Sequence, residues 1–227
     1  MIKIGHRGAA GYEPENTLIS IKKALELKVD IIELDVYCCQ SGELVLFHDP
    51  TLERTTNGKG YLIRKSYAEL QQLDAGKGER IPTLESALKL INRKAKVNIE
   101  LKGRRTLHPV LHMIEKYVHY YGWQYDDFLI SSFKRSKLKK IRKLKSKIPI
   151  GALLLYRSLG FLKFSQKIKT YAIHVNYKIV NSKLINDAHK KGIKVFVWTV
   201  NDLQEITYFK KLGVDGIFSD YPDRIGE

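Results

Sequence analysis

Three acidic residues lie on two short runs of the chain that have the alternation of β-strands. Side chains alternate between the faces of a strand, so Glu33 and Asp35 share one face of IIELDV (31–36). Glu100 lies on the equivalent face of VNIEL (97–101). If the aliphatic faces pack outward, the three carboxylates point into a common interior, where repulsion and lost hydration need compensation. One divalent cation supplies it, and oxygen ligands favour Mg²⁺ or Ca²⁺, with Mn²⁺ also suited.

The same carboxylates have a structural alternative, which is buried ion pairing with Arg7 and Lys102. For a single carboxylate that alternative is the better explanation. For three carboxylates on two strands, each near the C-terminal end of its strand, a metal site is the better one. Barrel enzymes place their chemistry at that end of their strands.

Two histidines close predicted strands in a similar way. His6 ends the first strand and is followed by Arg7, and His48 ends LVLFH (44–48) and is followed by Asp49. An imidazole titrates near neutral pH, so each histidine suits general acid or general base catalysis beside a metal. The sequence does not indicate which of the two accepts a proton and which donates one.

The segments that must position these residues alternate between strand-like and helix-like patterns. The expected strands are IKI (2–4), IIELDV (31–36), VNIEL (97–101), FLIS (128–131), IGALL (150–154), AIHV (172–175), KVFVW (194–198) and GIFS (216–219). The expected helices between them include residues 16–27, 84–91, 134–145, 182–191 and 202–212. This α/β alternation predicts parallel βαβ units, and eight of them predict a (β/α)8 TIM barrel.

One strand departs from the alternation. Only CCQSGE separates IIELDVY from LVLFHD (44–49), which is too short for a parallel crossover, so we expect a β-hairpin after the second strand. A two-residue turn near Ser41 and Gly42 would pair Asp35 with His48. Residues 50–82 have weak periodicity and several glycines, and we interpret them as a small insertion above the barrel mouth. The whole chain, 1–227, is then a single domain.

Composition excludes several classes of protein. The 227 residues are 44% hydrophobic, which is enough for a sizeable core and excludes wholesale disorder. No apolar run approaches the ~18 residues of a membrane span, and the N-terminal residues lack the pattern of a secretory signal. The two cysteines, Cys38 and Cys39, are adjacent, so no disulfide framework is expected and the cytoplasm is the simplest location.

Six motifs, in order and spacing, match those of a known family. They are GHRGAAGYEPENT (5–17), ELD (33–35), LVLFHD (44–49), NIELK (98–102), WTVN (198–201) and GVDGIFSDYP (213–222). Together they resemble the glycerophosphodiester phosphodiesterases from the first predicted strand to the last. The combination of HRG and PENT with the downstream ELD and HD is specific, whereas any one piece alone is weak evidence.

The resemblance implies a barrel with a small insertion after the HD strand. It also implies metal-dependent hydrolysis of glycerophosphodiesters to sn-glycerol 3-phosphate and an alcohol. The roles that it assigns are an acid/base pair of His6 and His48, metal ligands Glu33, Asp35 and Glu100, phosphate-binding residues Arg7 and Lys102, and a glycerol-pocket wall of Trp198.

The chemistry of these groups is coherent for a phosphodiester. A Lewis-acidic cation, Arg7 and Lys102 would neutralise the phosphate oxygens and the charge that grows in the transition state. One histidine would deprotonate the nucleophile and the other would protonate the leaving alkoxide. The nucleophile is either water or the glycerol 2-hydroxyl, which would give a cyclic phosphate that water then opens.

Two other functions compete with this one. The same site acting on lysophospholipids would be a lysophospholipase D, which a longer apolar groove at 153–164 would favour. The formal charge of +16 raises the alternative of a non-catalytic binder of anionic lipid or nucleic acid, but three inward carboxylates suit a polyanion poorly, and we expect no nucleic acid as a partner.

Nine basic residues in Lys134 to Lys147 are either the solvated face of an outer helix or a peripheral contact with anionic membranes. The oligomeric state and the preferred alcohol group stay open.

Overall fold

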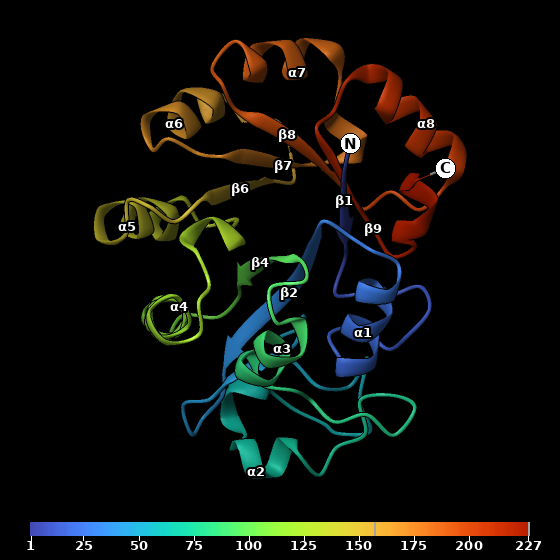
Figure 1. Ribbon diagram of the computed structural model, residues 1–227. Helices are drawn as coiled ribbons and strands as arrows, with labels where there is room; N and C mark the ends of the chain where they lie inside the picture. Colours follow the sequence, from blue (N-terminus) through green and yellow to red (C-terminus); the bar gives the residue numbers. More distant parts are fainter. Residues whose placement is uncertain (157, 227) are drawn as a thin grey trace.

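The chain forms a closed barrel of parallel strands surrounded by helices (Figure 1). The computed structural model describes residues 1–156 and 158–226, and these form a nine-stranded sheet in the order β1-β9-β8-β7-β6-β5-β4-β2-β3, closed by pairing of β1 with β2. The strands are β1 (Ile2–Gly5), β2 (Ile31–Cys38), β3 (Leu44–Leu46), β4 (Lys96–Leu101), β5 (Phe128–Ser132), β6 (Ile150–Leu154), β7 (Ala172–Asn176), β8 (Lys194–Trp198) and β9 (Gly216–Ser219). β3 is antiparallel to β2 and lies outside the barrel. The predicted TIM barrel with a hairpin after the second strand is confirmed.

Helices follow the strands around the outside of the barrel. They are α1 (Leu18–Glu26), α2 (Tyr67–Leu70), α3 (Leu84–Ile91), α4 (Leu107–Tyr120), α5 (Arg135–Leu144), α6 (Phe161–Lys167), α7 (Ser182–His189) and α8 (Leu203–Leu212), with 3₁₀ turns η1 (Leu62–Arg64), η2 (Tyr125–Asp127), η3 (Tyr177–Ile179) and η4 (Pro222–Gly226). Polar side chains accept hydrogen bonds from backbone N–H groups at the start of several helices, as Thr17 does for α1 and Asp202 for α8. Among the helices in the described part of the chain, none has the length and apolar character that crossing a bilayer requires.

The two faces of each strand have separate packing partners. Ile32 and Leu34 belong to the large core between the strands and the helices. Away from the C-terminal ends of the strands, the interior of the barrel is filled by a second apolar cluster of Ile4, Ile31, Leu129, Ala172, Phe196 and Phe218. Glu33 and Asp35 follow Ile31 on the inward face of β2. The interior is therefore polar at the C-terminal ends of the strands and apolar farther from them.

The register of the hairpin differs from the prediction. The backbone N–H of Phe47 donates to the carbonyl of Asp35 at 2.9 Å, so Asp35 lies opposite Phe47 and not opposite His48. The turn spans the three residues 40–42, and its last residue, Gly42, has a φ of +107°. A three-residue turn with glycine at a positive φ shifts the pairing by one position relative to a two-residue turn. His48 therefore lies past the end of β3.

Residues 50–82, predicted as an insertion, form a compact segment with a small core of its own. That core joins the outer face of the hairpin to the segment through Tyr37, Cys39, Val45, Phe47, Leu52, Leu62, Leu70, Ala75 and Ile81. In Figure 1 the segment, which includes α2, lies outward of α1 and α3. Its Arg54 returns to the barrel mouth and donates to Asp49 and Glu15.

Candidate active site

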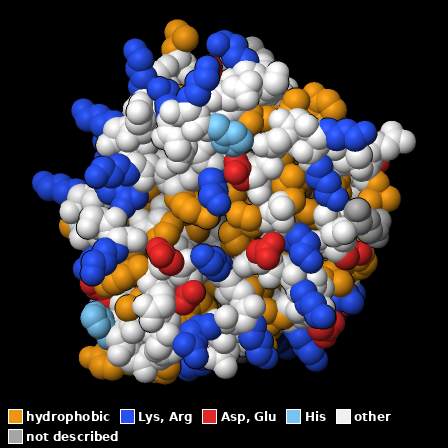
Figure 2. All heavy atoms as spheres, turned by 45° about the horizontal axis from the view of Figure 1, so that its top comes forward, with side chains coloured by type: hydrophobic (Ala, Val, Ile, Leu, Met, Phe, Trp, Pro, Cys, Tyr) orange, Lys and Arg blue, Asp and Glu red, His pale blue; other side chains and the backbone are white. Residues whose placement is uncertain are grey.

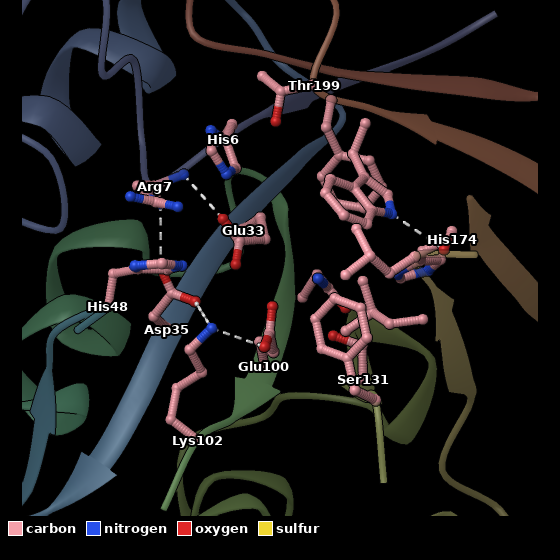
Figure 3. A pocket seen from close by; sticks show the side chains of 16 residues that line it. His6, Arg7, Glu33, Asp35, His48, Glu100, Lys102, Ser131, His174 and Thr199 are labelled. Carbon is pink, nitrogen blue, oxygen red and sulfur yellow. Dashed lines mark hydrogen bonds and ion pairs between the residues drawn. The ribbon is translucent and has the colours of Figure 1, made fainter. Parts of the chain in front are cut away.

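A pocket of about 230 Å³ lies at the C-terminal ends of the strands (Figure 3). All eight residues that the sequence predicts for the site line this one pocket: His6, Arg7, Glu33, Asp35, His48, Glu100, Lys102 and Trp198. They come from β2, β4 and β8 and from the loops that follow β1, β3 and β4. The position is the one at which a parallel barrel gathers side chains from many strands.

The three predicted carboxylates converge. Asp35 of β2 is the register partner of Glu100 of β4, and Glu33 lies two residues before Asp35 on the same face. One oxygen from each carboxylate lies within 4.8 Å of those of the other two. Glu33 and Asp35 are buried and Glu100 is nearly so. Three buried carboxylate oxygens at this spacing match the ligands that Mg²⁺ and Ca²⁺ prefer.

Two basic side chains already neutralise part of this charge. Lys102 Nζ lies 2.8 Å from Glu100 Oε1 and 3.2 Å from Asp35 Oδ1. Arg7 Nε lies 3.2 Å from Asp35 Oδ2, and its Nη1 donates to Glu15 Oε1 at 2.7 Å. The ion pairs of the structural alternative are therefore present. They reach Asp35, Glu100 and Glu15, whereas the structure gives Glu33 no ion pair among the described residues, so the acidic group keeps excess negative charge.

That excess falls on Glu33. Within the described residues its side chain has the backbone N–H of Arg7, at 2.8 Å, as its hydrogen-bond donor. Burial, with the nearby Asp35 and Glu100 charges added, raises the pKa of Glu33 well above its ordinary value. Burial alone would also raise the pKa of Asp35, but Lys102 and Arg7 outweigh it and lower that pKa. A buried carboxylate without a matching cation, next to two others, fits a bound divalent ion.

A short loop after β1 holds these groups in place. Asn16 donates from Nδ2 to Asp35 Oδ2 and accepts the Asp35 backbone N–H at Oδ1, both at 3.1 Å. Arg7 and Asn16 have positive φ angles of 53° and 58°, and Gly8 has a φ of 92°. A Cβ at Gly8 would lie 2.3 Å from Ser20 Oγ, so glycine is required where the loop meets α1. The HRG and PENT motifs are therefore the two ends of one tight loop.

His6 is oriented by a carboxylate that follows the last strand. Its Nδ1 lies 2.7 Å from Asp220 Oδ1. Asp220 Oδ2 accepts from Asn201 Nδ2 at 2.7 Å, and Asn201 Oδ1 accepts the backbone N–H of Asp220 at 2.9 Å. Burial would raise the pKa of Asp220, but its hydrogen bond with His6 lowers it. An ionised Asp220 requires a proton on Nδ1 of His6, which leaves Nε2 to accept or donate a catalytic proton.

His48 has a parallel arrangement. Its Nδ1 lies 2.5 Å from Asp49 Oδ1, and Asp49 Oδ2 accepts from Arg54 Nε at 2.5 Å. Arg54 in turn donates two hydrogen bonds to Glu15, which also accepts from Arg7. Burial lowers the pKa of His48. Each histidine is thus held through Nδ1 by its own aspartate.

The side of the pocket across from the histidines is largely apolar. Trp198 donates from Nε1 to the carbonyl of His174 at 3.0 Å, and its ring meets that of Phe133 edge-on at 5.9 Å between centroids. Leu153 and Leu155 of the β6 end complete this side. The pocket therefore has a charged half and an apolar half, which suits a polar headgroup joined to a less polar group.

Several residues of the site were not predicted. Asp220 had a signal that could have found it, because it follows the last strand directly, as the other acids follow or end theirs. Asp49 follows His48 directly. Arg54 and Glu15 carry no local signal, because the insertion brings them together from 39 residues apart. His174 lies inside an apolar strand, where sequence periodicity treats it as core.

The burial of His174 makes a prediction about acid stability. Its ring lies against those of Phe196 and Phe218, at 5.4 and 5.0 Å between centroids, and burial lowers its pKa to about 3. Between about pH 6.5 and 3 the unfolded chain binds this proton and the folded chain does not, so stability falls as pH falls. Urea unfolding at pH 7 and pH 4.5 should show an acid loss smaller by about 2 kcal/mol in His174→Phe than in the parent. Equal losses in the two proteins would contradict a buried, neutral His174.

Comparisons with known proteins relate nearly the whole chain to one family. A model of the glycerophosphoryl diester phosphodiesterase family matches residues 6–224, which include all eight predicted positions. The glycerophosphodiester phosphodiesterase of Caldanaerobacter subterraneus subsp. tengcongensis is 36% identical over 231 residues, covering 98% of this chain and 95% of that protein. A phosphodiesterase of Oleispira antarctica, solved with the product sn-glycerol-3-phosphate, has a TM-score of 0.90 at 31% identity and covers 100% of this chain and 95% of its own. The glycerophosphodiester phosphodiesterase of Thermotoga maritima has a TM-score of 0.85 at 28% identity, covering 98% and 96%.

Proposed function

This chain belongs to the glycerophosphoryl diester phosphodiesterase family and is a phosphoric diester hydrolase, and from that premise we propose that it hydrolyses glycerophosphodiesters to sn-glycerol 3-phosphate and an alcohol with one divalent cation. The observation that carries the proposal is the convergence of three carboxylates, two buried and one nearly so, within 4.8 Å in a pocket that two aspartate-bound histidines also line. The product named for the Oleispira antarctica relative supports the same substrate class for this pocket.

We assign the cation to Glu33, Asp35 and Glu100, and propose Mg²⁺ or Ca²⁺, with Mn²⁺ as a substitute, because the ligands are all oxygen atoms. A cation bound there would supply Lewis-acid neutralisation of a phosphate oxygen. The excess negative charge around Glu33 supports this assignment, since ion pairing with Arg7 and Lys102 leaves it uncompensated.

The remaining charge of the phosphate falls to Arg7 and Lys102. Both are largely buried, with side chains 15% and 14% exposed, so their charges act with little screening by water. The Arg7 guanidinium offers a planar pair of donors, whereas Lys102 offers a point charge. They stabilise the phosphodiester when it binds and, more strongly, the additional charge of the transition state.

The proton transfers fall to His6 and His48. Because Asp220 and Asp49 occupy the two Nδ1 atoms, each imidazole has Nε2 for the substrate. A neutral imidazole accepts the proton of the attacking hydroxyl, and an imidazolium gives one to the leaving alkoxide. The attacking group is either water or the glycerol 2-hydroxyl, and detection of a cyclic glycerol phosphate during turnover decides for the hydroxyl.

The experiment measures release of sn-glycerol 3-phosphate from glycerophosphocholine before and after EDTA, with add-back of Mg²⁺, Ca²⁺ or Mn²⁺ separately. We expect EDTA to abolish turnover and one of the three ions to restore it. Melting temperature is measured in parallel, because an ion that binds the folded chain raises it independently of catalysis. Full turnover after exhaustive chelation would overturn the assigned role of the carboxylates.

A second substrate class, the lysophospholipids, is favoured by one observation. A groove of about 380 Å³ lies between α6 and α7, and its Leu154 is the chain neighbour of Leu153 and Leu155, which line the pocket. Its apolar lining consists of Leu154, Leu159, Phe161, Leu162, Ile179 and Leu184. A comparison of kcat/KM for glycerophosphocholine and lysophosphatidylcholine distinguishes the two classes. If an acyl chain occupies the groove, Leu159→Asp should lower kcat/KM for the lysophospholipid alone.

For α5 we propose a peripheral contact with anionic membrane. Leu138 and Ile141 of this helix are buried against the barrel, whereas Leu144, its last residue, is 44% exposed. The exposed face carries Lys134, Lys139, Lys140, Lys143 and Lys147. Figure 2 shows many basic side chains with hydrophobic ones between them on the displayed face.

Vesicle sedimentation tests this contact. We expect binding to vesicles of mixed phosphatidylglycerol and phosphatidylcholine, loss of binding at high salt, and little binding to phosphatidylcholine alone. Replacing Lys139, Lys140 and Lys143 with glutamine should weaken binding, since each cation near the surface contributes about 1 kcal/mol. The matched control replaces Lys22, Lys28 and Lys94, on other parts of the surface. Equal losses in both triple variants would contradict a specific role for α5.

A further inference from the structure

Three buried polar side chains in the pocket are not used by the proposed mechanism. Asn98, Ser131 and His174 are at most 1% exposed and all line the pocket. Among the described residues, no hydrogen-bond partner meets Asn98 Oδ1, Ser131 Oγ or either ring nitrogen of His174. Buried polar atoms are nearly always paired, because leaving one unpaired costs about 1–3 kcal/mol. Three such side chains lining one pocket indicate a bound ligand or water that forms the missing hydrogen bonds.

The three side chains belong to one region of the barrel wall. Ser131 of β5 is the register partner of Glu100 of β4 on one side and of Gly151 of β6 on the other. The ring of His174, from β7, fills the space in front of Gly151, where an added Cβ would lie 2.4 Å from the His174 Cε1 atom. Ser131 and His174 therefore flank the same glycine. We call Asn98, Ser131 and His174 the polar floor.

The polar floor faces the charged half of the pocket. Figure 3 shows Ser131 and His174 across the pocket from His6, Arg7 and His48. The indole of Trp198 donates to the backbone carbonyl of His174 and so anchors the strand next to the apolar wall. A ligand with its phosphate at Arg7 and Lys102 would extend its other end toward this floor.

The chemistry of the polar floor selects a neutral hydroxyl group. A serine hydroxyl and a neutral imidazole each donate and accept, and the Asn98 Oδ1 atom accepts, so a group that does both completes them. The ring of His174 stacks on Phe196 and meets the tilted ring of Phe218, and these apolar neighbours leave it no counter-charge for a bound anion. An ammonium group would have acceptors here but no carboxylate within the floor itself.

We propose that the polar floor binds the terminal hydroxyl of the glycerol moiety and thereby selects glycerol over shorter or deoxygenated alcohols. The inference rests on the proposed function, since it requires a glycerophosphodiester in the pocket. The terminal hydroxyl is the polar group of glycerol farthest from the phosphate, and it reaches the floor while the 2-hydroxyl stays near the reacting phosphorus. Asn98, Ser131 and His174 act here as specificity-determining residues.

The test compares glycerophosphocholine with the matching diester of propane-1,2-diol, which keeps the 2-hydroxyl and lacks the terminal one. In the parent enzyme we expect kcat/KM to fall by about 10- to 100-fold for the deoxy substrate, because two or three hydrogen bonds are lost. In Ser131→Ala and in His174→Phe that ratio should shrink to about threefold. A ratio that both variants leave unchanged would overturn the assignment.

A matched control and a binding measurement make the result specific. Ser165 is also a buried serine with no partner for Oγ among the described residues, but it lies on α6 away from the pocket, so Ser165→Ala should leave the substrate ratio unchanged. Calorimetry compares sn-glycerol 3-phosphate with propane-1,2-diol 1-phosphate, whose affinities should differ about tenfold in the parent and little in Ser131→Ala. Equal affinities in the parent indicate bridging water only and overturn the proposal. Failure to hydrolyse either diester with any cation would instead remove the proposed function, and the affinity difference still tests the floor.

Discussion

Replacement of His6 with alanine is expected to lower kcat for glycerophosphodiester hydrolysis by about 10²–10⁴-fold, which is the usual contribution of one general acid or base. KM should change little, because His6 binds Asp220 and not the carboxylates proposed to hold the cation. Steady-state release of sn-glycerol 3-phosphate at saturating cation measures the effect. If substantial activity at neutral pH remains, proton transfer by His6 is not part of the mechanism.

Two further variants separate catalysis from structure. Asp220→Asn keeps the shape of the Asp220 side chain but removes the charge that fixes the tautomer of His6, so we expect a smaller loss in kcat than in His6→Ala and a shifted pH–rate profile. His189 is the matched control, since its Nε2 lies 2.8 Å from Asp215 Oδ2 in a histidine–aspartate pair outside the pocket. His189→Ala should keep the activity of the parent.

Replacement of Glu33 with glutamine is expected to lower kcat/KM by about 10³-fold or more, because charge stabilisation by a bound cation is worth several kcal/mol. The same change should stabilise the cation-free protein by about 1 kcal/mol, since it removes a buried carboxylate without a matching charge. The parent should melt at a higher temperature when Mg²⁺ or Ca²⁺ is added, whereas Glu33→Gln should gain little. Calorimetric melting with and without cation measures both effects.

The stability of the cation-free protein should depend on pH through Glu33. Because burial raises its pKa, the unfolded chain releases this proton at a lower pH than the folded chain does. The cation-free parent should therefore lose stability as pH rises above about 4.5, and Glu33→Gln should lack this loss. Glu26→Gln is the matched control on the exposed end of α1, 53% exposed, and should behave as the parent. A cation-induced increase of equal size in parent and Glu33→Gln would exclude Glu33 as a ligand.

Much of the fold was predictable because it depends on local patterns. Alternation of aliphatic residues along β2 separates Ile32 and Leu34, which pack against helices, from Glu33 and Asp35, which face inward. The hairpin was predictable from the short connection, but its register was not, since one extra residue in the turn depends on the positive φ of Gly42. The boundaries of the helices at 84–91 and 203–212 agree with expectation to within one residue.

The site was predictable in part, for a related reason. Residues that end strands of a parallel barrel meet at one edge, so His6, Glu33 and Glu100 could be grouped before any coordinates were known. Arg54 could not, because it enters through the insertion and reaches Glu15 only after that segment folds. His174 was equally hidden, because a histidine within an apolar strand has the same pattern as core.

The sequence by itself determined the barrel, the family and the eight side chains that face its mouth, because alternation along strands and motif order are properties of short stretches of chain. The tertiary structure alone decided which charges are compensated: among the described residues it gives Glu33 no ion pair with a basic side chain, and it gives His6 and His48 one aspartate each. It also decided that Ser131 and His174 meet across Gly151 with no partner within the described chain. Those outcomes depend on distances between strands and loops far apart in the chain, which no local pattern contains.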